Sequence, residues 1–342
     1  MEEPSIVAVG VVWNHRDRLP LLLRSLDEQT RRPEQTVLVD AASHDGVSTW
    51  LAQAYPYIST LRLFQHRGLG HAWRQAAKFA LQRVAPEAQS RTWLLFVTPE
   101  TLLAKDVCAQ LLKEVVAHPE IGAVGPAILR AWYQGEGEDG LEQIEPTELV
   151  ESLGMQPLRS FAWMHRGRGE SLRMHEPIAT EVFAPSSTVA MYRADHVEKL
   201  LHLEAFSLAW KTVDAMFLDL AWRLHWLGMK TYVLPDVLAW RVEHKNNRGE
   251  HARTWLECLA IENDRRLLVR GHLVGGWPRM RTLLPRMWAT IRSWPYRAWR
   301  LVGKADRQPA SEALLMRVGQ RLLETHRVEA LETLNKWILG RP

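Results

Sequence analysis

The chain has 342 residues, 46% of them hydrophobic and 24% charged, a composition typical of a globular protein and not of a disordered one. Its net charge of +4 is unevenly spread, because residues 245–342 hold 19 Lys and Arg against 9 Asp and Glu. No apolar run approaches the roughly 18 residues that a membrane-spanning helix needs, and the start, Met-Glu-Glu-Pro, lacks the features of a signal peptide. Cys108 and Cys258 show neither a disulfide framework nor metal-ligand spacing. We therefore expect a cytoplasmic protein with room for one large or two small domains.

Strand and helix patterns alternate over the first 130 residues. Short apolar runs predict strands at 5–12, 36–39, 60–64, 94–97 and about 123–129, and apolar residues at helical spacing predict helices at 17–29, 47–54, 68–84 and around 107–115. Such alternation with short links indicates an α/β fold: a doubly wound, mostly parallel sheet flanked by helices.

Oxygen-bearing side chains follow two of these strands, at the edge where parallel sheets bind ligands. Asp40 ends the second strand, and Thr98 and Glu100 follow the strand at 94–97. A carboxylate at Glu100 could hold Mg²⁺ or Mn²⁺, and Asp40 could accept from a uracil or thymine imide or from ribose hydroxyls. The alternatives are a surface turn at Glu100 and a helix N-cap or turn residue at Asp40 or Asp45.

The later part of the chain has weaker patterns. Residues 134–139 are rich in Gly and acids and predict an exposed loop, and 159–174 show no periodicity. Arginines in that second stretch, Arg168 among them, could face a diphosphate or be solvated loop charge. Strands are predicted at 181–192, with a break at 185–187, at 230–235 and at 237–242, the last leading to His244.

The C-terminal region is basic and rich in tryptophan. Residues 270–304 contain eight Lys and Arg, no acid, and four tryptophans. A basic amphipathic helix of this kind suits the surface of an anionic membrane, but it could equally be a helical cap that packs on the core. We do not expect nucleic acid as a partner, since the front of the chain bears no recognised nucleic-acid module. A further amphipathic helix is expected at 311–339.

A series of motifs follows in chain order. They are Val11-Val12-Trp13-Asn14, Val39-Asp40-Ala41-Ala42-Ser43-His44-Asp45-Gly46, Gly68-Leu69-Gly70-His71-Ala72, Val97-Thr98-Pro99-Glu100-Thr101 and Asp219-Leu220-Ala221-Trp222-Arg223-Leu224. In combination, over residues 5–245, they resemble glycosyltransferase family 2, enzymes of the GT-A fold that use sugar nucleotides, and the rhamnosyltransferases in particular.

The resemblance implies a different role for each of three parts of the chain. Residues 1–130 would bind the nucleotide sugar, 131–245 would form the acceptor half of the same GT-A domain, and 246–342 would be a helical extension. The resemblance assigns donor binding to Asn14, Asp40, Asp45, Gly70 and Thr98. It assigns a divalent cation, Mg²⁺ or Mn²⁺, to Glu100 and His244, and the departures described below leave that cation weakly bound or absent. The partners implied are a dTDP- or UDP-sugar, a lipid-linked or cell-envelope glycan acceptor and the inner face of the plasma membrane.

Two departures from the family pattern put the activity in question. Thr98 stands where the metal motif has its first acid, and the usual catalytic base position falls on Phe217. Asp214, three residues earlier, is the nearest replacement as base, with Asp219 the other candidate. As alternatives, Asp214 could be first-turn helix charge and Asp219 an i,i+4 partner of Arg223. The sequence thus predicts an inverting glycosyltransferase or, alternatively, a weakened or inactive relative that acts as a scaffold in glycan assembly.

Overall fold

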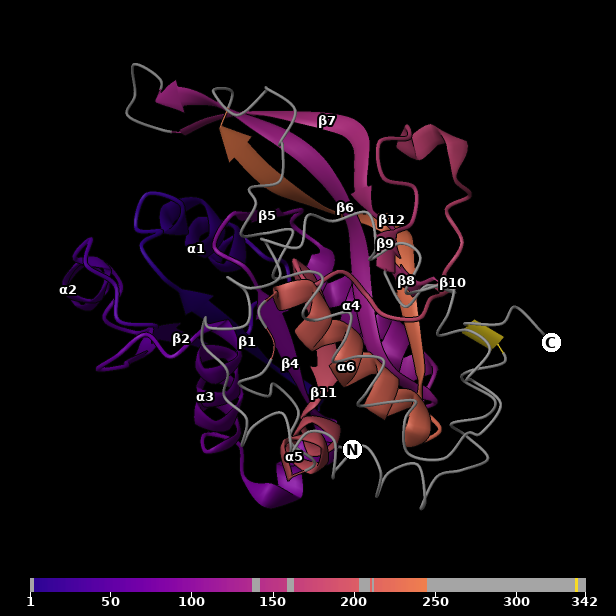
Figure 1. The fold of residues 1–342 in the computed structure, drawn as a ribbon, viewed down its shortest axis with the longest axis horizontal. Helices are drawn as coiled ribbons and strands as arrows, with labels where there is room; N and C mark the ends of the chain where they lie inside the picture. The colour runs from indigo at the N-terminus through magenta and orange to yellow at the C-terminus, as the bar shows by residue number, and fades with distance from the viewer. Residues whose placement is uncertain are drawn as a thin grey trace, which may run out of the picture.

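The computed structural model describes residues 3–136, 142–158, 163–202, 210, 212–244 and 336–337. Within them, ten strands form one sheet with the main order β10-β12-β6-β11-β4-β1-β2-β3, with β5 beside β12 and β7 beside β6 (Figure 1). These strands are β1 (Ser5–Val12), β2 (Gln35–Asp40), β3 (Ser59–Arg62), β4 (Thr92–Val97), β5 (Thr101–Leu103), β6 (Ile121–Glu136), β7 (Glu142–Ser152), β10 (Thr180–Glu181), β11 (Val189–Arg193) and β12 (Lys230–His244). A separate pair consists of β8 (Met155–Pro157) and β9 (Trp163–His165).

Most strands of the main order run in one direction. β1 is parallel to β2 and β4, β2 to β3, and β6 to β12. β11 is antiparallel to both of its neighbours, β4 and β6. The carboxyl ends of β1, β2, β4, β6 and β12 therefore meet at one edge of the sheet. This arrangement confirms the predicted doubly wound, mostly parallel sheet.

Helices cover both faces of the sheet. One hydrophobic cluster joins α3 (Leu69–Leu81), α5 (Ala194–His202) and α6 (Val213–Trp226) to strand residues such as Leu94 and Phe96. The other joins α1 (Leu19–Asp27), α2 (Val47–Ala54) and α4 (Val107–Ala117) to the alternate residues Leu95 and Val97. Because successive side chains of a strand point to opposite faces and both faces are covered, the central strands are continuous apolar runs.

The sequence did not predict every element. The expected loop at 134–139 begins inside β6, which continues to Glu136 and pairs with β7, and the two expected strands at 230–235 and 237–242 form the single strand β12 with a register shift between Leu234 and Leu238. The strands β5 and β7 and the helix α5 were not predicted. Among the described strands, β7 pairs with β6, and most of its length is exposed, so it lacks the apolar run that marks a buried strand.

A short piece of the C-terminal region contacts the core. Lys336 Nζ lies 2.5 Å from Glu181 Oε1, and the ring of Trp337 lies 6.0 Å from the rings of both Phe183 and His225. The basic stretch 270–304 lies outside the described residues. No helix in the part that the structure describes is long and apolar enough to cross a membrane.

Candidate functional site

The loops after β1 and β2 are joined through two of the expected donor-binding residues. Asn14 Oδ1 accepts from the His44 N–H at 2.8 Å, and the Asn14 N–H donates to Ser43 Oγ at 3.0 Å. Asp45 accepts from the Arg16 N–H at 2.9 Å. Asn14 itself has a left-handed φ of 55°, a conformation that asparagine tolerates better than most residues. Asn14 and Asp45 therefore fix the shape of this part of the sheet edge.

Asp40 lies beneath the loop that it introduces. Its carboxylate is fully buried, Oδ1 accepts from the Ser43 N–H at 2.7 Å, and Oδ2 accepts from Ser48 Oγ. Ala42, in the same loop, has a left-handed φ of 65°, a strained conformation for a residue with a Cβ. The turn-residue alternative for Asp40 is thus the one that the geometry supports. A nucleoside at this edge would meet the loop surface and not this carboxylate.

Sequence reasoning did not single out an aromatic pair at this edge. The rings of Trp13 and His66 stack at 4.2 Å with an interplanar angle of 8°, and Trp13 is 43% exposed. An exposed indole can support a further flat ring.

Gly70, another expected donor residue, is buried in the first turn of α3. A shallow pocket of about 430 Å³ opens beside the loops that follow β1 and β2. It is lined by Asn14, Arg16, Asp17, Pro20, Asp45 and Trp50.

The turn after β4 is attached to two other strands. Thr98 Oγ1 lies 3.2 Å from Thr101 Oγ1, and the Thr98 N–H donates to the Thr188 carbonyl at 3.1 Å. The Glu100 carbonyl accepts from the Val242 N–H at 2.8 Å. Thr98 is almost fully buried, so its hydroxyl serves this turn. The backbone contact of Glu100 places its side chain beside β12.

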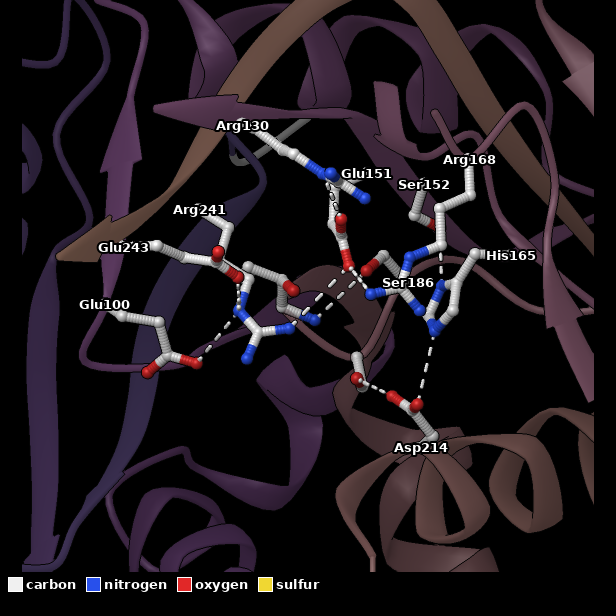
Figure 2. A network of polar contacts seen from close by, with 12 residues as sticks. Glu100, Arg130, Glu151, Ser152, His165, Arg168, Ser186, Asp214, Arg241 and Glu243 are labelled. Carbon is white, nitrogen blue, oxygen red and sulfur yellow. Dashed lines mark hydrogen bonds and ion pairs between the residues drawn. The ribbon is translucent and has the colours of Figure 1, made fainter. Parts of the chain in front are cut away.

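Arg241, on β12, is the cation that faces Glu100 (Figure 2). Its Nε lies 3.8 Å from Glu100 Oε1 and 4.0 Å from Glu243 Oε1, and its Nη1 lies 3.8 Å from Glu151 Oε1. Burial by itself would lower the pKa of Arg241, but these three carboxylates outweigh burial and raise it. The guanidinium is therefore firmly charged.

Glu151 anchors the other side of this network. Its carboxylate is almost fully buried and accepts from Arg130 Nε at 2.8 Å, and Arg168 Nη2 lies 2.7 Å away. Arg168 thus pairs with a carboxylate inside the network, as Figure 2 shows. We name the set Glu100, Arg130, Glu151, Arg168, Arg241 and Glu243 the arginine–glutamate network.

The described residues show no ready-made site for a divalent cation at Glu100. No group of three His, Cys, Asp or Glu gathers where it could hold a metal within the ranges that the structure describes. The nearest charged partner of the Glu100 carboxylate is a guanidinium, which would repel a cation placed there. The side chain of His244, the other expected ligand, lies outside the described part.

Asp214 lies at the same edge of the sheet. It occupies the first turn of α6, behind the Thr212 cap, and its Oδ1 accepts from Ser187 Oγ at 2.5 Å. Ser187 precedes β11, whose Val189 pairs with Val97 at the end of β4. The Asp214 carboxylate therefore sits at the carboxyl end of β4, near the turn that holds Glu100.

A histidine that the sequence did not indicate supports Asp214. His165 Nε2 lies 3.2 Å from Asp214 Oδ2, and its Nδ1 lies 2.9 Å from Ser152 Oγ. Burial by itself would raise the pKa of Asp214. The His165 imidazole, the Ser187 hydroxyl and the Arg241 guanidinium outweigh burial and hold the pKa of this carboxyl below its ordinary range. Asp214 is 32% exposed on its side chain, so the ionised carboxylate can still meet a ligand.

Asp219 and Phe217 lie in the core. Asp219 Oδ2 accepts from Arg223 Nε at 2.9 Å, and neither side chain is exposed. This is the i,i+4 pair that the sequence offered as the alternative, and it keeps the Asp219 carboxylate away from any acceptor. Phe217 is also fully buried and packs at 5.6 Å against both Trp73 and Phe96. Of the two catalytic candidates, Asp214 alone reaches the edge.

Comparisons with known proteins bear on the fold. No protein-family model matches the chain, and no curated protein sequence matches it. A solved structure of GalNAc-T7 with UDP, GalNAc and Mn²⁺ is similar, with a TM-score of 0.57 and 14% sequence identity, over 99% of this chain. The chain spans 57% of the length of that one. The likeness confirms the predicted GT-A type fold.

Proposed function

We propose that the chain is a glycosyltransferase that moves a sugar, with inversion, from dTDP-rhamnose or a UDP-sugar to a lipid-linked or cell-envelope glycan. The observation that carries this proposal is that an ionised carboxylate, Asp214, and the charged, partly exposed side chain of Arg241 both lie at the carboxyl edge of a GT-A type sheet and interact electrostatically. The structural neighbour was solved with a nucleotide and a sugar, which supports the same class of ligand here. Membership of family 2 rests on the sequence motifs.

The proposed donor site spans two parts of the edge. The exposed face of Trp13 would support the nucleobase, and Asn14 and Asp45 would hold the loops that surround it. The diphosphate would lie toward the turn after β4, where Thr98 and the backbone of Glu100 position the arginine–glutamate network. A diphosphate binds well to guanidinium groups because two N–H donors of one guanidinium can bond to two negatively charged phosphate oxygens.

The proposed chemistry needs one proton acceptor and one stabilised leaving group. The acceptor hydroxyl loses its proton to an Asp214 oxygen while the hydroxyl oxygen bonds to the anomeric carbon. The bond from that carbon to the donor phosphate breaks, and its electron pair stays on the diphosphate. Because the new bond forms on the face opposite to the leaving group, the anomeric configuration inverts.

His165 would position the base. Its Nε2 faces the Asp214 carboxylate and its Nδ1 faces Ser152, so the ring is held from both sides. The second oxygen of Asp214 is held by Ser187. The carboxylate is thereby fixed in one orientation, which is what a general base requires.

A specific observation favours the second candidate function, a catalytically weakened relative that binds glycan or nucleotide as a scaffold. A carboxylate whose pKa is held low accepts a proton less readily than an ordinary one. In this alternative the edge still binds a nucleotide sugar, but no sugar is transferred.

Two measurements separate the transferase from the scaffold. The first is isothermal titration with UDP-sugars, dTDP-sugars and the free nucleotides, and the second is a turnover assay for released nucleoside diphosphate. Binding together with release supports the transferase, and binding without release supports the scaffold. No binding of any nucleotide contradicts the transferase. We place the protein at the cytoplasmic leaflet of the membrane in this proposal, and association of the full chain with anionic vesicles tests that part.

A further inference from the structure

We infer that the guanidinium of Arg241 takes the place of a divalent cation at the donor diphosphate, so that nucleotide binding does not depend on metal. This inference rests on the proposed function and specifies how the leaving group is held. It follows from the position of Arg241, from its free hydrogen-bond donors and from the poor fit of the surrounding residues to a metal.

Arg241 lies where the cation of the resembled motif would be expected. Its strand partner is Thr101, directly after Glu100, and the Glu100 carboxylate is 3.8 Å from its Nε. Glu243, two residues along β12, lies 4.0 Å from the same nitrogen. Two carboxylates that could have shared a metal thus face one guanidinium.

The donors of Arg241 are available to a ligand. At 3.8–4.0 Å its contacts with the three glutamates are charge contacts and too long for hydrogen bonds. Its Nε is buried and has no hydrogen-bond partner among the described residues, although the side chain as a whole is 40% exposed. Because Nε is itself buried, a phosphate oxygen would meet the guanidinium at the exposed end of the side chain.

The other arginines of the network explain why Arg241 makes no short ion pair with Glu151. Glu151 is engaged at short range by Arg130, at 2.8 Å, and by Arg168, at 2.7 Å. It therefore contributes charge to Arg241 but keeps its closest contacts elsewhere. Arg130 and Arg168 are used in the fold, and Arg241 is the member of the network left to meet an anion.

The charge of Arg241 also reaches the proposed base. It is one of the groups that hold the pKa of Asp214 low. Figure 2 shows the two residues in one polar region, with the Arg241 guanidinium against the glutamates and Asp214 against His165. A diphosphate that bound the guanidinium would therefore extend toward the carboxylate that receives the acceptor proton. The same cation would then stabilise the charge that develops on the leaving group.

Glu100 provides a test whose sign differs between the two possibilities. If Glu100 held a metal, Glu100→Gln would weaken nucleotide binding in the presence of Mn²⁺. If it only faces Arg241, the same change removes an anion near the diphosphate, so binding is unchanged or tighter. The side chain is mostly buried but makes no short ion pair, and glutamine keeps its size.

The experiment is isothermal titration of UDP and dTDP into the full chain, first in EDTA and then with added Mn²⁺. We expect the dissociation constant to agree within about twofold in both conditions, and Arg241→Met to raise it about 10- to 100-fold, the usual worth of a charged hydrogen-bond donor. Arg241→Lys keeps the charge but loses the fork, so its loss should be smaller. Arg173→Met serves as the matched control, because Arg173 is 79% exposed and pairs with Glu148 outside the network.

Each outcome decides a different point. Binding only with Mn²⁺, or a loss of binding in Glu100→Gln, overturns the inference and leaves the proposed function standing. Binding in EDTA that Arg241→Met does not weaken also overturns it. No nucleotide binding under either condition overturns the proposed function itself. Thermal unfolding of each variant shows whether the fold is kept.

Discussion

The surroundings of Asp214 set both the pKa and the orientation of its carboxylate. Three described groups lower its pKa against the effect of burial: the His165 imidazole, the Ser187 hydroxyl and the Arg241 guanidinium. Each comes from a different part of the chain. The carboxylate is consequently ionised at neutral pH and is held in one orientation by His165 and Ser187.

Asp214→Asn should remove most of the transferase activity while leaving the fold intact. The amide cannot take the acceptor proton, and a general base typically contributes about 10²–10⁴-fold to the rate. We expect kcat to fall by that factor with little change in nucleotide affinity, as measured by nucleotide release and titration. The matched control is Asp236→Asn, at an exposed position of β12, which should leave kcat unchanged. Equal activity of Asp214→Asn and the native chain would remove Asp214 from the mechanism.

At the scale of elements, α6 carries a residue of the sheet edge, Asp214, and a residue of the core, Phe217, in neighbouring turns. Its first turn carries Asp214 to the edge of the sheet, and its next turn carries Phe217 into an aromatic cluster with Trp73 and Phe96. Thr212 caps the helix through the Ala215 N–H at 3.3 Å. The helix is therefore set by core packing, and its position determines where Asp214 points.

Phe217→Asp should not restore a catalytic base. The position has no exposure, so the change would bury a carboxylate in an apolar cluster, and we expect loss of the folded state. Phe217→Leu, which keeps an apolar side chain, should cost only about 1–3 kcal/mol of the free energy of unfolding. Denaturant unfolding of both variants measures this difference. A folded, active Phe217→Asp protein would contradict the placement of α6.

The start of α5 should make stability depend on pH. Burial lowers the pKa of His196 to about 4, although Asp195 opposes that effect, and Arg193 Nη2 lies 2.6 Å from its Nε2. The folded state thus favours the neutral ring, while the unfolded state binds a proton near pH 6.5. Stability from this source is complete above that value and is lost as pH falls toward 4.

The free energy of unfolding should therefore fall between pH 6.5 and pH 4 by an amount on the order of 1–3 kcal/mol from this group. In His196→Gln, which cannot be protonated, this part of the decrease should be absent. Urea unfolding at several pH values gives both curves. Identical slopes in the two proteins would show that His196 is not held neutral.

The sequence predicted those elements whose apolar pattern lies within a single segment of the chain. The strands β1, β2 and β4 and the helices α1 to α4 were predicted because their apolar periodicity lies within each segment. β7 was missed because it is polar and exposed, and α6 was recognised only from the motif at 219–224.

The arginine–glutamate network could not be predicted, because it depends on register. Arg130 and Arg241 are neighbours through the pairing of β6 with β12, and Glu151 lies on β7, which pairs with β6. These residues are far apart in the chain, and a shift of one residue would turn each side chain to the other face. The motif residues Asp40 and Glu100 were correctly placed at strand ends, but their partners decide what they can do.

At the scale of the whole molecule, the last part of the chain returns to the domain. Trp337 packs against Phe183 and His225, next to the Lys336–Glu181 ion pair. His225 in turn lies 2.8 Å from the Phe183 carbonyl. This contact ties residues 336 and 337 to α6, the helix that carries Asp214.

Trp337→Ala should lower the free energy of unfolding by about 1–3 kcal/mol, since it removes a large apolar contact with the core. Lys336→Ala removes a partly exposed ion pair and should cost less than about 1 kcal/mol. Chemical denaturation of the full-length variants compares the two. An unchanged Trp337→Ala protein would mean that this contact contributes nothing to the fold.

A crystal structure of the chain with UDP or dTDP would test most directly whether Arg241 and Asp214 form the transfer site. We predict a diphosphate bound to the Arg241 guanidinium at the carboxyl edge of β4, with the Asp214 carboxylate facing the side where the sugar would be. A nucleotide bound elsewhere on the molecule, with Arg241 and Asp214 making no contact to it, would show that these residues do not form the site.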